Sequence, residues 1–381
     1  MKFIHISDLH IGRKLEEYSL AEDQKFILDK IIEAVISEKP DALLIAGDIY
    51  DRSLPPTEAV TIFDEFLYKI SKTGTETFII SGNHDSAERL SFGNRLMDGS
   101  GIHISGVYDG TIRFFDMKDE FGTVRIHLFP FIRPHNMRQF FPDEKIESFT
   151  DAARVALSQA KISTDGRNVL VCHQFVTGAQ RYESEEIYIG GAENIDADVF
   201  DPFDYVALGH LHSPQNVGSE RIRYCGTPLK YSLSEADQQK SLTVAELGEK
   251  GELRIREIPL KPMRDYVKLK GRYSDLMDLG FYSGSAYPDS FVHITLTDED
   301  EVPYAVSRLG VIYKYITGLR YDNTKSRHIQ TEEDGEAASS LSPYDLFSKL
   351  YGSLNGREMN KVQSEYIKGL IEDIWEAEDE T

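Results

Sequence analysis

Residue types that bind metal ions follow several short apolar runs of the chain. Five runs that we read as β-strands are each followed by a polar motif, namely Asp8-Leu9-His10, Gly47-Asp48, Gly82-Asn83-His84-Asp85, His173 and Gly209-His210-Leu211-His212. Because the carboxyl ends of strands in an α/β sheet converge on one edge, we expect these motifs to meet in space. The candidate ligands are two carboxylates, one amide oxygen and four imidazoles: Asp8, Asp48, Asn83, His10, His173, His210 and His212.

This mixed set of oxygen and nitrogen donors contains no thiolate, which suits Mn, Fe or Zn rather than an iron–sulfur or cysteine-type zinc site. It is too large for one catalytic ion that keeps an open position, but it fits two ions that share a bridging carboxylate. Such pairs, typically about 3.5–4 Å apart, serve in-line displacement at phosphorus. Gly47, Gly82 and Gly209 each precede a candidate ligand and are expected to allow a sharp turn there.

His84 and Asp85 are assigned a separate role, because adjacent side chains cannot all point at one ion. We predict that His84 gives a proton to the leaving oxygen and that Asp85 fixes the tautomer of His84. The alternative for Asp85 is that it caps the helix that follows.

The elements that position these motifs alternate between apolar strands and helical patterns up to about residue 260, as in an α/β domain. We expect strands at Phe3–Ile6, Ala42–Ala46, Thr77–Ser81, Val124–Phe129, Val169–Cys172, Tyr205–Leu208, Leu242–Leu247 and Leu253–Ile258. Apolar residues three and four apart predict amphipathic helices at Ala21–Ser37 and Thr57–Ser71.

The pattern changes after Pro259–Pro262, where a small second α+β unit is expected. It would contain strands at Tyr266–Leu269 and Phe291–Leu296, a helical patch near Leu276–Leu279 and a helix over Tyr304–Tyr315. The acidic stretch Thr331–Ser340 reads as a linker, and two amphipathic helices follow it. The first begins at Ser342-Pro343, and the second carries Val362, Tyr366, Leu370 and Ile374 at four-residue spacing.

Composition limits the classes of function. The chain has 381 residues, more than one compact core usually holds, and a formal net charge of −22. Binding to DNA therefore cannot rest on the average surface charge and needs a local cationic patch, a metal or another subunit. Two cysteines and no apolar stretch long enough for a signal peptide or a membrane span predict a cytoplasmic protein with no membrane partner.

The motifs together resemble the calcineurin-like metallophosphoesterase superfamily and, within it, the bacterial SbcD nuclease subunits. The segments Gly190–Glu193, Asp204–His210 and Arg223–Ser232 carry the closer resemblance, which extends over nearly the whole chain. It implies a four-layer α/β/β/α phosphoesterase domain over residues 1–260, a DNA-facing capping domain over 261–330, and a linker with a helical tail over 331–381 that binds an SbcC-type coiled-coil ATPase.

The resemblance also implies a site. One Mn²⁺ ion would be held by Asp8, His10, Asp48 and His212, and the second by Asp48, Asn83, His173 and His210, so that Asp48 bridges them. His84 matches the catalytic histidine of the family. Asp51 stands where archaeal and eukaryotic relatives often have a histidine, and it is expected only to orient a neighbour.

The implied function is a Mn-dependent DNA nuclease, with double-strand exonuclease and single-strand or hairpin endonuclease activity, in DNA repair, recombination and replication. The family further implies a homodimer within a heterotetramer. Among loop arginines that could reach a backbone phosphate (Arg52, Arg89, Arg133 and Arg181), we assign Arg52 and Arg89 to substrate binding. The alternatives are a small-molecule or phosphoprotein phosphoesterase with the same metal site, and a non-enzymatic scaffold on the same fold.

Overall fold

The computed structural model describes residues 1–180, 194–324, 343–355, 359–368 and 370. It divides into two compact units, one of 1–295 with 302–320 and the other of 296–301 with 321–381. The predicted domain boundaries after residues 260 and 330 stay a prediction. Outside the described residues lie several features named above: Arg181, the segment Gly190–Glu193, the linker Thr331–Ser340 and the second helix beyond residue 370.

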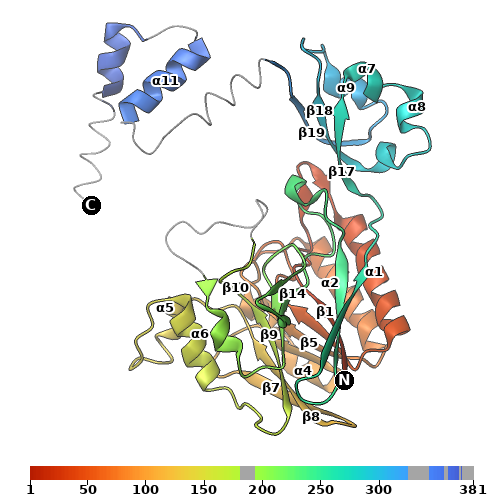
Figure 1. The fold of residues 1–381 in the computed structure, drawn as a ribbon, viewed down its shortest axis with the longest axis vertical. Coiled ribbons are helices and arrows are strands. Elements are labelled where there is room, and N and C mark those ends of the chain that lie inside the picture. Colours follow the sequence, from red (N-terminus) through yellow and green to blue (C-terminus); the bar gives the residue numbers. More distant parts are fainter. Residues whose placement is uncertain (181–193, 325–342, 356–358, 369, 371–381) are drawn as a thin grey trace. The chain divides into compact units, whose positions relative to one another are not determined.

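Two six-stranded sheets form the centre of the first unit (Figure 1). The first sheet has the order β16-β15-β1-β4-β5-β6, with the bounds Leu253–Pro259, Ser241–Leu247, Lys2–Ile6, Ala42–Ala46, Glu76–Ile80 and Ile102–Ser105. The second has the order β13-β14-β12-β9-β8-β7, with the bounds Gln215–Val217, Ser219–Tyr224, Tyr205–Gly209, Arg167–His173, Gly122–Phe129 and Arg113–Asp119. All eight predicted strands of this region are present.

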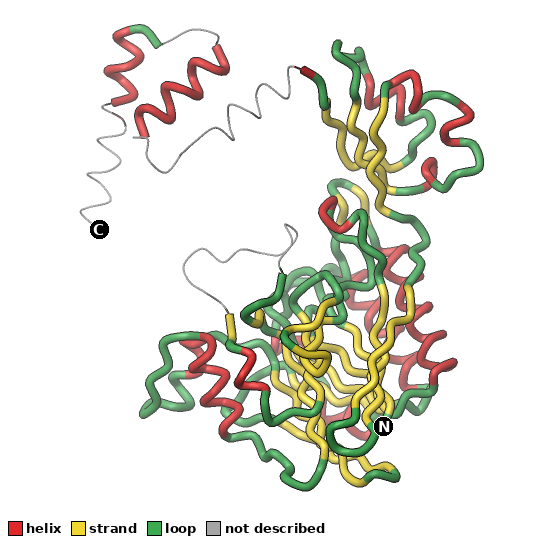
Figure 2. The backbone as a smooth tube through the Cα atoms, in the orientation of Figure 1, coloured by secondary structure: helices red, strands yellow, loops and turns green. Residues whose placement is uncertain are grey.

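The sheets pack face to face, and helices cover their outer faces (Figure 2). Strand β4 shows why, because every one of its residues is buried. Its Leu44 joins the apolar layer between the two sheets, whereas Leu43 and Ile45 join the layer under the helices. Helices α1 (Ala21–Glu38) and α2 (Thr57–Ser71) cover the first sheet, and α6 (Phe149–Ser158) covers the second. The predicted four-layer α/β/β/α fold is confirmed.

The strands that precede the candidate ligands are parallel. β1 pairs with β4, and β4 with β5, in the first sheet, while β9 pairs with β12 in the second. Their carboxyl ends therefore open at one edge of the sandwich. The short strands and helices of this part of the chain also include β2, β3, β10 and β11 and α3, α4 and α5, at Lys14–Leu15, Tyr18–Ser19, Phe175–Val176, Asn194–Ile195, Ala87–Leu90, Asn94–Met97 and Pro134–Met137.

A three-stranded sheet follows the sandwich in the chain. It consists of β17, β18 and β19, with helices α7, α8 and α9 between them, at Tyr266–Gly271, Phe291–Leu296, Tyr315–Tyr321, Tyr273–Leu276, Leu279–Tyr282 and Ala305–Leu309. The predicted helix Tyr304–Tyr315 is wrong in its second half, since α9 stops at Leu309 and Tyr315 begins β19. Gly310 ends the helix, and the strand that follows is rich in the β-branched and aromatic residues that strands favour.

The C-terminal part contains the two predicted helices, α11 (Pro343–Asn355) and a helical segment over 361–368. Several of their apolar side chains are exposed, among them Leu350, Val362 and Tyr366. Among the described residues, no helix has both the length and the apolar character needed to cross a bilayer.

Candidate metal centre

The loops after β1 and β4 are joined by backbone hydrogen bonds at the sheet edge. The Asp8 amide donates to the Gly47 carbonyl (3.0 Å), and the His10 amide donates to the Asp48 carbonyl (3.0 Å). The loop after β12 is held against the first by His210, whose amide donates to both carboxylate oxygens of Asp8 at 3.0 and 3.1 Å. Motifs about two hundred residues apart in the chain are thus brought together, as the sequence predicts.

Four of the seven candidate ligands have left-handed backbone conformations. The φ angles of Asp8, His10, Asp48 and His210 are 53°, 43°, 50° and 106°. Residues with a Cβ rarely adopt such angles, and each instance costs on the order of 1–3 kcal/mol. Strain of this kind persists where a site requires a side chain to point in one direction, and here it lies on the residues that the sequence singles out as ligands.

Two glycines make room for the site. Gly47 has a φ of +85°, and a Cβ there would lie 2.6 Å from His173 Nδ1. Gly82 has an ordinary φ, but a Cβ on it would collide with the Asp48 carboxylate. The expected sharp turn therefore applies to Gly47, whereas Gly82 is needed because a neighbouring loop approaches too closely for any side chain.

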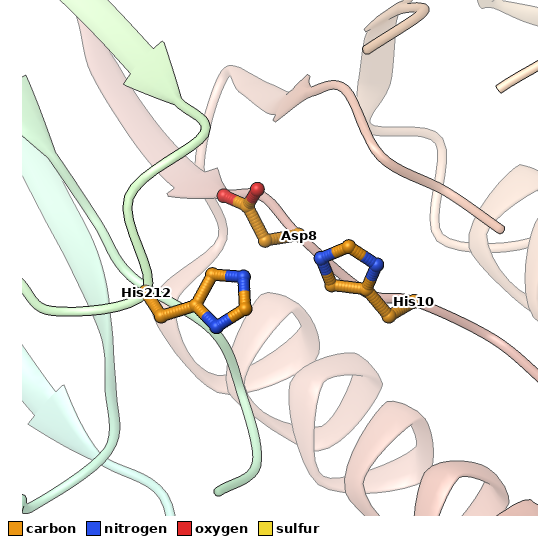
Figure 3. Close-up of side chains that lie close together, drawn as sticks. All are labelled: Asp8, His10 and His212. Atoms are coloured by element: carbon orange, nitrogen blue, oxygen red, sulfur yellow. The ribbon is translucent and has the colours of Figure 1, made fainter. Parts of the chain in front are cut away.

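Asp8, His10 and His212 form the first group of donors, and their side chains point toward one another (Figure 3). One ligand atom from each lies within 4.8 Å of the others. Both ring nitrogens of His10 are buried without a hydrogen-bond partner, and burial lowers the pKa of His10 well below its usual value. A neutral, buried imidazole with unsatisfied nitrogens is costly unless a cation occupies the space beside it.

Asn83, His173 and His210 form the second group. The Asn83 Oδ1 atom lies 3.0 Å from His173 Nε2 and 3.0 Å from His210 Nδ1. His173 Nδ1 donates to the Ala46 carbonyl (2.7 Å), which leaves Nε2 as the ring nitrogen on the Asn83 side. Donor atoms held about 2.0–2.1 Å from one ion in octahedral geometry lie at such separations from one another.

Asp48 lies between the two groups. Its Oδ2 atom is 3.8 Å from His10 Nε2 and 3.3 Å from His173 Nε2. Burial raises the pKa of Asp48, but the neighbouring imidazoles outweigh it and hold the pKa well below its usual value. Burial lowers the pKa of His173, and the carboxylates outweigh it, so the pKa rises to about 9. An ionised carboxylate in contact with both groups is suited to bridge two cations.

The donor set fits two divalent ions. It combines carboxylate, amide and imidazole donors, and the two cysteines of the chain are buried and not among them. Burial raises the pKa of the Cys172 thiol, which keeps it protonated and unsuited to bind a metal. Oxygen and nitrogen donors of this kind suit Mn, Fe or Zn.

Glu235 supports His212, and sequence reasoning missed it. The His212 Nδ1 atom donates to Glu235 Oε1 at 3.1 Å, which orients the ring. Glu235 is fully buried, and its other oxygen accepts from Lys240 Nζ at 2.6 Å. Histidine ligands of metals commonly donate their second ring N–H to a carboxylate in this way. Glu235 follows the Arg223–Ser232 segment as a single glutamate outside any motif, so the sequence does not indicate this role.

His84 lies at the site, but a different group orients it. The His84 Nδ1 atom donates to the backbone carbonyl of Asp51 (3.0 Å), and its Nε2 atom is 4.0 Å from Asp48 Oδ2. Asp85 instead accepts from the amides of Ile49, Tyr50 and Gly82 at 3.1, 2.9 and 2.9 Å. The prediction that Asp85 fixes the tautomer of His84 is wrong. The Asp85 carboxylate instead accepts hydrogen bonds from three amides and so joins the loops after β4 and β5. Burial and the Asp48 charge raise its pKa to about 6.

The predicted substrate-binding arginines are at the surface. Arg52 is 81% exposed, with its Nε atom 3.6 Å from Asp51 Oδ2, and Arg89 is exposed on α3. Asp51 also accepts from Arg13 at 2.9 Å. The expectation that Asp51 orients a neighbour agrees with these contacts.

Comparisons with known proteins find relatives over nearly the whole chain. The family model of the calcineurin-like phosphoesterases matches residues 1–214, and that of the type 5 capsule protein repressor C-terminal domain matches residues 261–353. The chain is 30% identical to the SbcD subunit of the SbcCD nuclease of Staphylococcus epidermidis, over 99% of this chain and 100% of the relative. It is 32% identical to the protein of the same name from Staphylococcus saprophyticus, over 97% and 98%.

Among solved structures, a dimetal phosphatase from Danio rerio aligns over 68% of this chain and 95% of its own, with a TM-score of 0.40 and 12% identity. The matched family model covers more than half of the chain, and both relatives are matched almost end to end. The chain therefore belongs to the calcineurin-like phosphoesterases and, among them, to the family of the SbcD subunits of SbcCD nucleases.

Proposed function

We propose that this protein is a Mn-dependent DNA nuclease. The observation that carries the proposal is the convergence of oxygen and nitrogen donors from five strand ends on one buried site, in a chain that resembles SbcD nuclease subunits from end to end. The activities that we infer are double-strand exonuclease and single-strand or hairpin endonuclease, used in DNA repair, recombination and replication.

We assign the metal ligands as the sequence predicts. Asp8, His10, Asp48 and His212 would hold one ion, and Asp48, Asn83, His173 and His210 the other. Two divalent ions at such a site lower the pKa of water and stabilise charge on the attacking and leaving oxygens. Burial and the fixed ring orientations keep the donors in place before substrate arrives.

His84 is the proposed proton donor. Its Nδ1–H donates to the Asp51 carbonyl, so Nε2 is the ring nitrogen left to act on the substrate. The protonated ring gives its Nε2 proton to the leaving oxygen of the cleaved phosphodiester and becomes neutral. Asp85 contributes by fixing the loop that carries His84, through the three amides that it accepts from.

The C-terminal helices are the proposed binding site for an SbcC-type coiled-coil ATPase. Exposed apolar side chains on both helices support this, because helices docked on a partner bury such residues. Phe92 and Leu96, which are 85% and 84% exposed just before and on α4, support a homodimer within a heterotetramer, since a partner copy would bury such apolar side chains. We also propose a cytoplasmic location, because both cysteines are buried free thiols rather than a disulfide.

The proposal is tested by incubating the purified chain with linear duplex and hairpin DNA in Mn²⁺, with a chelator control. Two variants accompany the wild type. His84→Ala should retain metal and lose most cleavage, whereas Asp48→Ala should lose metal, as measured by equilibrium dialysis. If either variant cleaves DNA normally, the site is misassigned. If the wild type hydrolyses a generic phosphodiester but no DNA, alone or with its ATPase partner, the small-molecule alternative replaces the nuclease.

The partner assignment is tested by truncation at about residue 340. The shortened chain should bind metal as before and fail to co-purify with an SbcC-type ATPase. Co-purification at the wild-type level would place the partner contact elsewhere.

A further inference from the structure

Arg133 lies on the loop after β8, and the backbone of this loop is fixed at the edge that carries the metal centre. The amide of Phe131 donates to the carbonyl of Ser81, at the end of β5 (3.0 Å). The side-chain amide of Gln174 donates to the carbonyl of Ile132 (3.2 Å). The loop is thus attached to two of the strand ends that carry candidate ligands.

The Arg133 guanidinium lies over the Phe131 ring, 5.4 Å from its centroid. The same ring makes an edge contact with His173, with the centroids 6.3 Å apart. Phe131 therefore contacts both the guanidinium and a candidate ligand of the second ion. The Phe131 ring thus links the Arg133 guanidinium to the metal centre.

Arg133 differs from the other cationic side chains near the site. Arg13 and Arg52 are both paired with the Asp51 carboxylate. Arg133 has a buried Nε atom with no hydrogen-bond partner, the one arginine or lysine nitrogen of this kind within the described part of the chain. No carboxylate among the described residues forms an ion pair with it.

An uncompensated, half-buried guanidinium is unfavourable in the free protein, and a bound anion would relieve the cost. The rest of the chain offers carboxylates in excess, with 64 Asp and Glu against 42 Lys and Arg. A guanidinium left without a carboxylate in so acidic a chain is well suited to a ligand that brings its own negative charge. The guanidinium fork matches the geometry of two phosphate oxygens.

We propose that Arg133 binds a phosphate of the DNA backbone next to the scissile one, on the side of the second ion. The proposal rests on the nuclease function proposed above and names a substrate contact for it. The contact positions the strand without reading its sequence, as phosphate contacts do. Arg133 would act on the extended substrate only, because a small phosphodiester has no second phosphate to contact.

The test compares Arg133→Ala and Arg133→Lys with the wild-type chain on two substrates in Mn²⁺. The substrates are bis(p-nitrophenyl) phosphate, which has a single phosphate, and a linear DNA duplex. For Arg133→Ala, we expect kcat/KM on the small diester to stay within about twofold. The KM for DNA should rise about tenfold, the loss expected for one charged hydrogen bond. Arg133→Lys should recover part of the loss. Arg154→Ala, which removes an exposed cation on α6, should change neither substrate.

DNA binding provides a readout that does not depend on cleavage. Fluorescence anisotropy of a labelled duplex, measured against salt concentration, should give a slope smaller by about one for Arg133→Ala and a wild-type slope for Arg133→Lys. Equal losses on both substrates, or an unchanged slope, would overturn the Arg133 proposal. If the wild type binds DNA with the expected slopes but does not cut it, the nuclease proposal fails while the Arg133 contact stands. If the wild type does not bind DNA, both fail.

Discussion

Glu235 offers the sharpest test of how the metal centre is supported. Its carboxylate is fully buried, accepts from His212 Nδ1 at 3.1 Å and pairs with Lys240 Nζ at 2.6 Å. The change Glu235→Gln keeps the shape of the side chain and removes the charge. His212 then loses the ionic partner that fixes its ring, and Lys240 loses its counter-charge.

Two effects of different size follow. Loss of such a support costs about 10–100-fold in metal affinity, which is about 1.4–2.7 kcal/mol. Leaving a buried charge without its partner costs about 3–5 kcal/mol of unfolding free energy. Lys240 keeps hydrogen bonds to the His212 carbonyl (2.9 Å) and to Gln238 (2.8 Å), so we expect the lower end of this range.

A double variant separates the two effects. In Glu235→Gln with Lys240→Met, no buried charge is left unpaired, so most of the unfolding free energy should return. The metal affinity should stay low, because His212 is still without its carboxylate. Urea unfolding with a chelator measures the first quantity, and Mn²⁺ titration calorimetry measures the second. Asp237→Asn is the matched control, since this carboxylate is exposed and pairs with Lys268 at the surface.

Either of two results would contradict this role of Glu235. Wild-type Mn²⁺ affinity in Glu235→Gln would show that Glu235 does not support a metal ligand. Recovery of metal affinity together with stability in the double variant would show that the first loss came from general destabilisation. The control guards against an effect of removing any carboxylate from this loop.

Two further predictions concern packing and pH. Gly82→Ala should displace the Asp48 carboxylate and lower Mn²⁺ affinity about tenfold, as measured by titration calorimetry. It should also reduce the unfolding free energy by about 1–3 kcal/mol, as measured by urea unfolding. The control Gly99→Ala, whose added Cβ meets nothing within 4 Å, should change neither quantity. Burial lowers the pKa of His127 to about 4, so the unfolded chain binds the proton more readily and stability falls as the pH drops from about 6.5 towards 4. The loss of unfolding free energy should reach about 2 kcal/mol by pH 5. In His127→Leu, urea unfolding should show a smaller difference in stability between pH 7 and pH 5 than in the wild type. An equal difference in both proteins would show that His127 is not the source of the pH dependence.

Most of the strands and helices, and the residue types that meet at the site, could be predicted from the sequence. Buried strands read as continuous apolar runs, and in β4 the run Ala42–Ala46 matches the strand residue for residue. Parallel strands end at one edge, so motifs that follow them can be predicted to converge without knowing the fold in detail. The helix predicted over Tyr304–Tyr315 is wrong after Leu309. A short apolar segment is compatible with both the helical and the strand periodicity, and only its pairing with a neighbouring strand makes it a strand.

Which side chains contact one another depends on the tertiary structure. Asp85 accepts hydrogen bonds from three amides and does not orient His84, and Glu235 reaches His212 from 23 residues further along the chain. Arg133 and Arg52 both follow strand ends in the sequence, yet only Arg52 meets a carboxylate. Residue type and spacing determine where a strand ends, but the partner of a side chain depends on its rotamer and on segments far away in the chain. Those are fixed only when the two sheets pack.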